Sequence, residues 1–356
     1  MTELLIGTKK GLFVFDGEPG TGYEQTARAF AGEPVEYAMR DRRNGRLLAS
    51  VTNAFYGPKI WFTDDPADDW TQATGAVLPD GADTALERIW TIVAGEADGL
   101  IYAGGDPGVL FESRDGGATW DLNAALWEHP TRPSWTPGGG GLCLHSIVPW
   151  PGDPQRLALG ISAAGVWLTQ DGGASWRRGN SGLVPRYVPE EARAGSTDLC
   201  VHNLQRAREN PERIFMQFHG GVYRSDDAGQ TWTDIAAGLP SDFSFPLAVD
   251  PADPDSAFVI PLTADTDRVT AEGSARVYET RDAGASWRAR DEGLPQHDAY
   301  LTVLRHAFAS AGEGSRLELY FGTTSGHLFG SGDAGSTWSV AAECLPTIHS
   351  VVAVRR

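Results

Sequence analysis

The chain has 356 residues, with 43 glycines, 22 prolines, 12 tryptophans and 21% charged residues. This composition is typical of many short strands joined by tight turns, and all-β barrels and propellers of this length often form one unit. The net charge of −18 disfavours nucleic acid and anionic membrane surfaces as partners, because binding either needs a concentrated basic face.

The N-terminal residues 4–17 (LLIGTKKGLFVFDG) predict a strand, a tight turn and a second strand. This beginning lacks the basic region, the apolar run and the cleavage site of a secretory signal, and no stretch approaches the roughly 18 apolar residues of a membrane span. Three cysteines, Cys143, Cys200 and Cys344, are too few for a disulfide framework. We therefore expect a soluble, cytoplasmic protein.

Six octapeptides recur at near-constant spacing along the chain. Five of them read [Ser/Thr]-x-Asp-x-Gly-x-[Ser/Thr]-Trp, and the sixth, residues 63–70, keeps Thr63, Asp65 and Trp70 but lacks the glycine. The spacing of their aspartates matches one four-stranded blade per repeat. The five complete copies are residues 113–120, 169–176, 225–232, 280–287 and 331–338.

The octapeptide has the composition of a stapled hairpin turn. Its Asp carboxylate can accept backbone N–H bonds, its Gly permits a positive φ, and its hydroxyl residues add local bonds, while the Trp packs between blades. These residues resemble the Asp-box, or BNR (bacterial neuraminidase) repeat, of sialidases, sortilin-type receptors, xyloglucanases and photosystem assembly propellers. The resemblance implies that the boxes are structural and lie between the third and fourth strands of each blade, opposite the binding face.

Seven apolar segments predict the innermost first strands of seven blades. The last of them has no strands after it, whereas the N-terminal pair has no first strand before it, so we predict that both termini share one closing blade. Residues 1–356 are therefore predicted to form one domain, an all-β, seven-bladed β-propeller of four-stranded antiparallel blades. The seven segments are residues 35–39, 89–93, 144–148, 201–205, 245–249, 301–305 and 348–354.

Three long loops fall on the face opposite the boxes: residues 121–143, 181–200 and 263–275. Long loops in a compact propeller are more often functional than filler. In the first of them Trp127, His129 and Trp135 are candidate ligand-binding residues, because their flat faces can stack on a sugar ring or an aromatic group. The alternative is that they only cap the channel.

A local duplication places Cys143 and His145 in one blade and Cys200 and His202 in the next. Residues two apart on a strand point to the same side, and His219 in a strand link comes near the same channel mouth. Three imidazoles with nearby thiols suit Zn or Cu, so His145, His202 and His219 are candidate metal ligands and catalytic residues. The alternative is that they are buried, hydrogen-bonded channel residues.

Glu36 and His349 hold corresponding positions on two other first strands, and Asp298 precedes the segment 301–305. Glu36 and Asp298 are candidates for proton transfer, and His349 is a candidate for ligand binding. The alternative is that these groups are paired and inert.

Two functional hypotheses follow. The first is a sialidase-like hydrolase or lyase, glycosidase-like or metal-dependent, acting on a small or glycan-like substrate at the channel mouth. The second is a non-catalytic binding or assembly propeller for protein or carbohydrate ligands. The arginine triad and the Arg-Ile-Pro segment of sialidases, a six-bladed family, are not identified in this sequence, and the fold alone does not choose between the two hypotheses.

Overall fold

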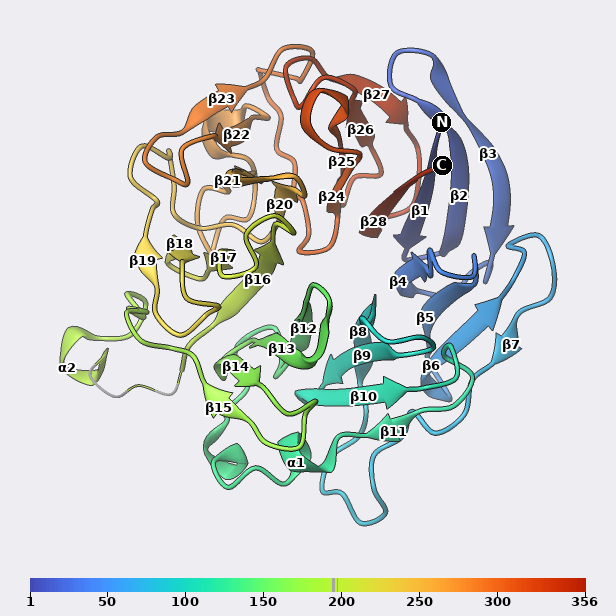
Figure 1. The fold of residues 1–356 in the computed structure, drawn as a ribbon. Helices are drawn as coiled ribbons and strands as arrows, with labels where there is room; N and C mark the ends of the chain where they lie inside the picture. The colour runs from blue at the N-terminus through green and yellow to red at the C-terminus, as the bar shows by residue number, and fades with distance from the viewer. Residues whose placement is uncertain (194–195, 197) are drawn as a thin grey trace.

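Seven blades form a closed ring around a central channel in the computed structural model, which describes residues 1–193, 196 and 198–356 (Figure 1). Each blade is a four-stranded antiparallel sheet, so the predicted seven-bladed β-propeller is confirmed. We number the blades from the one that contains the N-terminus.

The strands are short, as the density of turn residues predicts. Blade 1 contains β28 (Ile348–Arg355), β1 (Thr2–Thr8), β2 (Gly11–Glu18) and β3 (Gly22–Ala29), and blade 2 contains β4 (Val35–Arg40), β5 (Leu47–Asn53), β6 (Gly57–Thr63) and β7 (Thr71–Gln72). Blade 3 contains β8 (Arg88–Ala94), β9 (Ile101–Asp106), β10 (Val109–Ser113) and β11 (Asp121–Leu122), and blade 4 contains β12 (Leu144–Trp150), β13 (Asp153–Ile161), β14 (Gly165–Thr169) and β15 (Arg177–Arg178). Blade 5 contains β16 (Val201–Arg206), β17 (Ile214–Phe218), β18 (Gly221–Ser225) and β19 (Thr233–Asp234). Blade 6 contains β20 (Leu247–Asp250), β21 (Asp253–Val259), β22 (Val277–Thr280) and β23 (Arg288–Arg290), and blade 7 contains β24 (Phe308–Ala311), β25 (Glu318–Gly322), β26 (Leu328–Ser331) and β27 (Ser339–Ala342).

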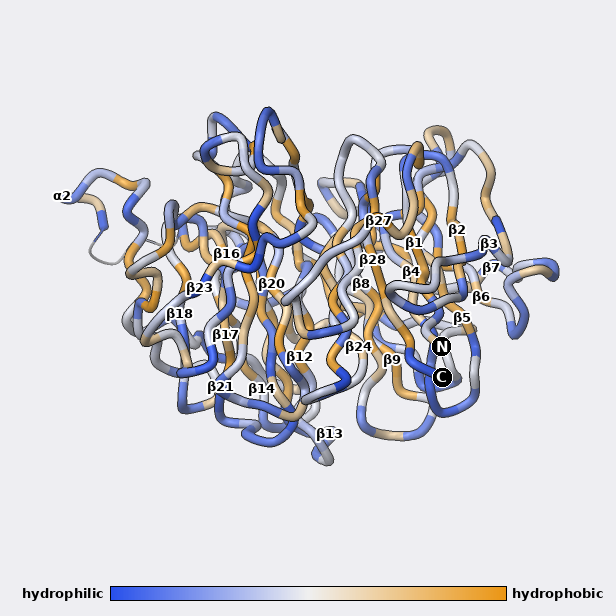
Figure 2. The backbone as a smooth tube through the Cα atoms, turned by 90° about the horizontal axis from the view of Figure 1, so that it is seen from above, coloured by the Kyte–Doolittle hydropathy of each residue, from blue (hydrophilic) through white to orange (hydrophobic). Residues whose placement is uncertain are grey.

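Helical structure is minor in the described part of the chain. It consists of α1 (Ala124–Trp127), α2 (Glu190–Arg193) and three single 3₁₀ turns at Arg132–Ser134, Ala271–Gly273 and Gly314–Arg316. None of the described helices is long and apolar enough to cross a membrane. Apolar stretches follow the strands, and polar residues gather in the loops at the two ends of the ring (Figure 2).

Blade 1 closes the ring with strands from both ends of the chain. β28 pairs antiparallel with β1 over nearly its full length, with Leu5 opposite Val352, and β1 pairs in turn with β2. The two termini lie side by side in Figure 1. This confirms the predicted shared blade, which leaves no open end between the first and last blades.

The octapeptides form the turns between the third and fourth strands. In the turn after β10, Asp115 Oδ1 accepts the N–H groups of Ala118 (3.0 Å) and Thr119 (2.9 Å), and the Ser113 hydroxyl donates to the same carboxylate (2.8 Å). Gly117 has a φ of 90°, which explains the glycine of the repeat. We call the end of the ring that carries these turns the box face, and the opposite end the top face.

The box tryptophans pack against the preceding blade. Trp120, Trp176, Trp232 and Trp338 are buried, and the indole N–H of Trp232 donates to the Gly179 carbonyl (2.8 Å). These contacts belong to the apolar clusters that fill the space between blades, so the tryptophans are part of the core.

One predicted strand is wrong. Residues 301–305 are not a strand, and the first strand of blade 7 is β24, which begins at Phe308. The chain turns at this point, because the Ala307 N–H donates to the Leu304 carbonyl, and Arg305 and His306 leave the sheet toward the channel. The apolar pattern of residues 301–304 is due to packing against the core of the last blades.

Candidate functional site

A cavity of about 240 Å³ lies at the top end of the channel, and we call it the mouth cavity. Since the turns from third to fourth strands mark the box face, the starts of the first strands lie at the top face, and most of the lining comes from these starts. Its main lining residues are Glu36, Arg88, Trp90, Phe245, Arg268, Thr302, Leu304, Arg305, His306 and His349.

A β-bulge at the start of five first strands determines which side chain enters this region. The register shifts at the same place in β4, β8, β12, β16 and β28. The extra residue of a bulge is unpaired and its side chain is re-aimed, here toward the channel. The five bulged residues are Glu36, Trp90, His145, His202 and His349.

Glu36 is the centre of a charged group in the mouth cavity. Its Oε1 lies 3.4 Å from Nε of Arg88, and its Oε2 lies 3.3 Å from Nδ1 of His349. Burial alone would raise the pKa of the Glu36 carboxyl, but the contact with His349 and the charge of Arg88 together lower it below its usual value. Glu36 is therefore ionised. Nδ1 of His349 makes no hydrogen bond among the described residues, so its contact with Glu36 is electrostatic. The nearby negative charge favours the tautomer with the proton on Nδ1, which leaves Nε2 of that ring to accept a proton.

Three guanidinium groups, those of Arg88, Arg268 and Arg305, line the same cavity. Arg305 is partly buried at the bottom, where its Nε donates to the His202 carbonyl (2.6 Å). Among the described residues its guanidinium donates to this carbonyl and to the Ser162 hydroxyl and not to a carboxylate. Burial lowers the pKa of Arg305, as expected for a cation that no carboxylate of the described residues pairs with. Within a chain of net charge −18, the mouth cavity therefore concentrates positive charge.

Two aromatic rings hold these cations in place. The Trp90 ring lies 4.7 Å from the Arg88 guanidinium carbon and 5.2 Å from that of Arg305, and the Phe245 ring lies 5.3 Å from that of Arg268. Aromatic faces with nearby charged donors are the usual components of a sugar or carboxylate site.

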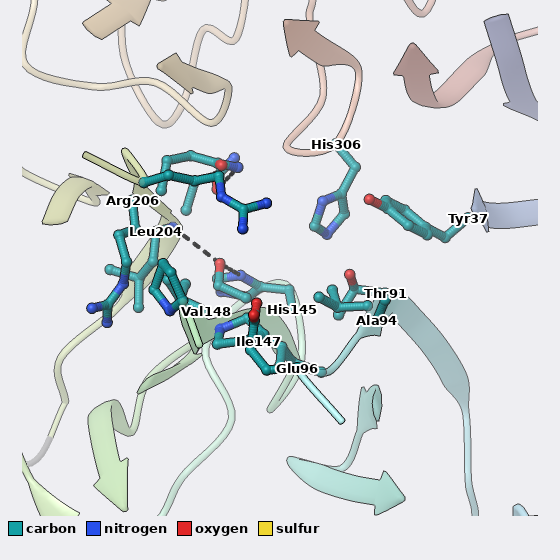
Figure 3. A pocket seen from close by; sticks show the side chains of 17 residues that line it. Tyr37, Thr91, Ala94, Glu96, His145, Ile147, Val148, Leu204, Arg206 and His306 are labelled. Atoms are coloured by element: carbon teal, nitrogen blue, oxygen red, sulfur yellow. Dashed lines mark hydrogen bonds between the residues drawn. The ribbon is translucent and has the colours of Figure 1, made fainter. Parts of the chain in front are cut away.

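Arg305 and His306 form a floor between the mouth cavity and the box-face half of the channel. Below them lies a second cavity of about 330 Å³, where His306, Tyr37 and His145 face one another (Figure 3). The ring centroids of Tyr37 and His306 are 5.2 Å apart, and burial lowers the pKa of His306 to about 3. His306 is thus a neutral side chain at the floor of the mouth.

The three predicted metal ligands do not come together as one group. His145 is fully buried, and both its nitrogens have partners: Nδ1 contacts the Ser146 hydroxyl (2.9 Å) and Nε2 the Val201 carbonyl (2.8 Å). His202 and His219 do meet, with ring centroids 5.2 Å apart, and the third ligand-type side chain beside them is Cys200.

Asp298 lies outside the mouth cavity. It is exposed, with a φ of 52°, on the top-face connection before residue 299, and it is not among the residues that line the cavity. The strand before which it was expected does not form, so nothing turns its side chain toward the channel.

Trp127, His129 and Trp135 come together, but their flat faces are largely covered. The Arg132 guanidinium lies 4.0 Å from the Trp127 ring and 5.4 Å from the Trp135 ring, and Trp135 is itself buried. The His129 ring packs edge-on against Trp167. The three residues line an open groove of about 760 Å³ on the outer top face, separate from the mouth cavity.

Sequence reasoning missed eight of the ten main lining residues of the mouth cavity. Trp90, Phe245 and Leu304 had the pattern of core residues, and nothing in the sequence marks a bulge that re-aims one of them. Arg305 was placed in a strand that does not exist. The eight missed residues are Arg88, Trp90, Phe245, Arg268, Thr302, Leu304, Arg305 and His306.

Comparisons with known proteins support the fold and point to carbohydrate-active relatives. No protein-family model matches the chain. It is 24% identical over 271 residues to a probable oligoxyloglucan-reducing end-specific xyloglucanase of Neosartorya fischeri, covering 69% of this chain. The chain spans only about a quarter of the length of the curated relatives it matches, 27% in this case.

Three solved structures are similar in fold. Apo AztD from Citrobacter koseri superposes with a TM-score of 0.57 and 13% identity, covering 99% of this chain and 98% of that one. An ancestral GH74 enzyme gives a TM-score of 0.56 and 17% identity, covering 83% and 36%. YCF48 bound to D1 peptide gives 0.51 and 15%, covering 82% and 78%. At these identities the likeness supports a β-propeller and no particular activity.

Proposed function

We propose that this chain is a carbohydrate-active propeller that binds a carboxylate-bearing sugar in the mouth cavity and cleaves it by elimination. The observation that carries the proposal is the charge of the cavity, where three guanidinium groups face one carboxylate, Glu36. Arg305 is partly buried and has no acidic partner in the described part of the chain, which is costly, and the carboxylate of a bound ligand compensates its charge.

The single carboxylate argues against the usual glycosidase mechanism. Most retaining and inverting glycosidases need two carboxyl groups that flank the bond to be cleaved. Among the described residues that line the mouth cavity, Glu36 is the only one with a carboxyl group. Glu36 is also ionised, whereas a general acid would need a raised pKa.

Elimination uses the groups that are present. The guanidinium groups neutralise the substrate carboxylate, which acidifies the adjacent C–H bond, and Nε2 of His349 accepts that proton while Glu36 stabilises the cationic ring. The electron pair of the C–H bond forms a carbon–carbon double bond, and the glycosidic oxygen leaves. The proton ends on the leaving oxygen, so the chain is cut without consuming water.

The relatives support a glycan as the substrate class. The matching xyloglucanases and the ancestral GH74 enzyme are glycan-acting by name. We carry over only the substrate class, because the chain corresponds to part of their length.

The test incubates the full chain with oligogalacturonates, with uncharged galacto-oligosaccharides of the same length, with xyloglucan oligosaccharides and with a fluorogenic sialoside. Elimination from the oligogalacturonates would produce ultraviolet absorbance from the new conjugated double bond, and His349→Gln would abolish it. Reducing ends released without that absorbance would contradict elimination and favour hydrolysis. Cleavage of the sialoside would favour a sialidase-like activity.

A second candidate function rests on the same cations. Three guanidinium groups at a channel mouth also suit the carboxylates of a peptide, and the fold resembles YCF48, whose solved complex holds a D1 peptide. Saturable binding of an acidic peptide, without turnover of any glycan, would favour this non-catalytic function.

A further inference from the structure

A second site lies in blade 5, beside the mouth cavity and independent of the proposed function. Cys200 precedes β16, His202 is the bulged residue of β16, and His219 lies in the link between β17 and β18. The thiol sulfur and one nitrogen of each imidazole lie within 4.8 Å of one another. We propose that Cys200, His202 and His219 bind one thiophilic transition-metal ion, Cu(I) or Zn(II).

Hydrogen bonds hold the backbone of Cys200 and His219 in place. The His219 N–H donates to the Cys200 carbonyl (3.0 Å), which brings the strand link next to the start of β16. The Cys200 N–H donates to the Tyr187 hydroxyl (2.7 Å), which donates in turn to the Asp198 carbonyl (2.8 Å). The three ligand atoms therefore start from a rigid frame. Metal bonds of about 2.0–2.3 Å require only that side chains rotate inward by roughly an ångström.

Each imidazole has one nitrogen engaged, and no described residue hydrogen-bonds to the other nitrogen, which is the arrangement of metal-bound histidines. Nδ1 of His202 contacts the Ser244 carbonyl, so its Nε2 is available. Nε2 of His219 lies 3.6 Å from an Asp265 carboxylate oxygen, so its Nδ1 is available. A carbonyl or carboxylate on the far nitrogen fixes the tautomer and the orientation of a ligating imidazole.

The surroundings favour a soft ion. Phe245 stacks on His202 with centroids 4.6 Å apart, and Tyr187 packs edge-on against His219 at 4.5 Å, so the site has aromatic walls. One thiolate and two imidazoles suffice for three-coordinate Cu(I). The side chain of His219 is 21% exposed, so a water molecule can reach the site as the fourth ligand of Zn(II).

Blade 4 supplies an internal comparison. Its Cys143 and His145 repeat the Cys200 and His202 motif, but the residue whose N–H donates to the Cys143 carbonyl is Ser162, where blade 5 has His219. Both nitrogens of His145 also have partners. Among the described residues, the blade 4 copy therefore has no counterpart of His219 and no free imidazole nitrogen, and it forms no group of three ligand atoms.

The experiment uses the tag-free full chain after treatment with a strong chelator. Cu(I) affinity is measured against bicinchoninate and Zn(II) affinity against a chromophoric zinc chelator, and Co(II) serves as a spectroscopic probe for thiolate ligation. We expect one equivalent of Cu(I) or Zn(II) with affinity well above that of free histidine, and a thiolate-to-cobalt charge-transfer band.

Three variants decide the ligand set. Cys200→Ser and His219→Gln should each weaken metal binding by more than about 100-fold, which exceeds the usual effect of changing a residue that only supports a ligand. Cys143→Ser, the matched control, should bind like the unmodified chain. Thermal melting verifies that each variant is folded. A folded wild-type chain that binds neither ion, or a Cys200→Ser variant with unchanged affinity, would overturn the site.

Discussion

Nδ1 of His349 lies 3.3 Å from Oε2 of Glu36, although the two residues come from opposite ends of the chain. The closing blade places β28 next to β4, and the two residues occupy the same bulge position in their strands. Ring closure therefore brings the proposed catalytic pair together, because Glu36 and His349 meet only when β28 completes blade 1 beside β4 of blade 2.

Glu36→Gln should separate binding from turnover. The amide keeps the shape of the side chain but has no negative charge. It therefore does not stabilise a protonated His349, and it does not compete with an anionic ligand for the guanidinium groups of the cavity. We expect the cleavage rate to fall by about 100-fold or more, while affinity for a uronate oligosaccharide stays equal or rises. Steady-state rates and calorimetric titration measure the two effects. Glu24→Gln, at an exposed carboxylate of β3, is the matched control and should change neither. A Glu36→Gln variant with full turnover would rule out this role.

Arg305→Met should remove anion binding at little cost in stability. Methionine fills part of the space of the guanidinium, and losing a partly buried, unpaired charge offsets the lost hydrogen bonds to His202 and Ser162. We expect the free energy of unfolding to change by no more than about 1–2 kcal/mol, while uronate affinity falls at least about 10-fold. Arg42→Met, at an exposed arginine, is the control. If Arg305→Met bound uronates like the control, the cavity charge would not be the recognition element.

The sequence was sufficient for the ring and its closure, because the octapeptides recur at near-constant spacing and six of the seven apolar segments overlap the first strands of blades. The sequence also predicted that Glu36 and His349 hold corresponding positions on the first strands of their blades. In the structure both are the bulged residue near the start of the strand. Positions along strands are set by local pattern, and local pattern is what a sequence displays directly.

The lining of the mouth was not predictable in the same way. A bulge needs one extra residue and leaves no composition signal, so Trp90 could not be distinguished from a core aromatic. Residues 301–305 have the alternation of a strand, yet Arg305 and His306 leave the sheet. His145 and His202 have nearly identical local motifs. They differ in the residue across the strand link, Ser162 or His219, and in the partners of their imidazole nitrogens, and neither difference is visible in the motif.

Trp176→Ala should destabilise the ring without affecting ligand binding. The indole is 7% exposed, packs in the cluster between blades 3 and 4, and donates to Asn123 Oδ1 (3.1 Å). We expect a loss of about 3–5 kcal/mol in the free energy of unfolding, the usual cost of a large-to-small core change. Chemical denaturation measures it, with Val340→Ala, at an exposed position of β27, as the control. Lost binding with an unchanged melting temperature would mean that the box face is the functional one.

Removal of residues 347–356 should open the ring. The deletion removes β28, the whole ladder to β1 and the core contacts of Ile348 and Val351, and it exposes the edge of β1. We expect a loss of several kcal/mol, seen as a lower melting temperature and a tendency to associate through the free edge. Removing residues 355–356 alone keeps most of the ladder and should have a small effect. A ten-residue deletion that melts like the full chain would contradict the closure.

Asp171 should make the stability of the ring depend on acid pH. Its carboxylate accepts hydrogen bonds from the Ser175 hydroxyl (2.5 Å), the Thr169 hydroxyl (2.7 Å) and the Ser175 N–H (2.9 Å). The two hydroxyl bonds, that of Ser175 first, lower the pKa of Asp171 from 3.8 to about 2. A carboxyl whose pKa is lower in the folded chain than in the unfolded chain stabilises the fold when the pH is above its unfolded pKa. This contribution disappears as the pH falls through its folded pKa.

The Asp171→Asn variant should therefore melt at a lower temperature than the unmodified chain above pH 3.8, and the difference between the two melting temperatures should vanish as the pH approaches 2. The aspartates of the other boxes are present in both proteins, so the difference between the two melting curves, measured by circular dichroism at each pH, isolates Asp171. A gap that stays constant across this range would show that the side chain acts by its shape and not by its charge.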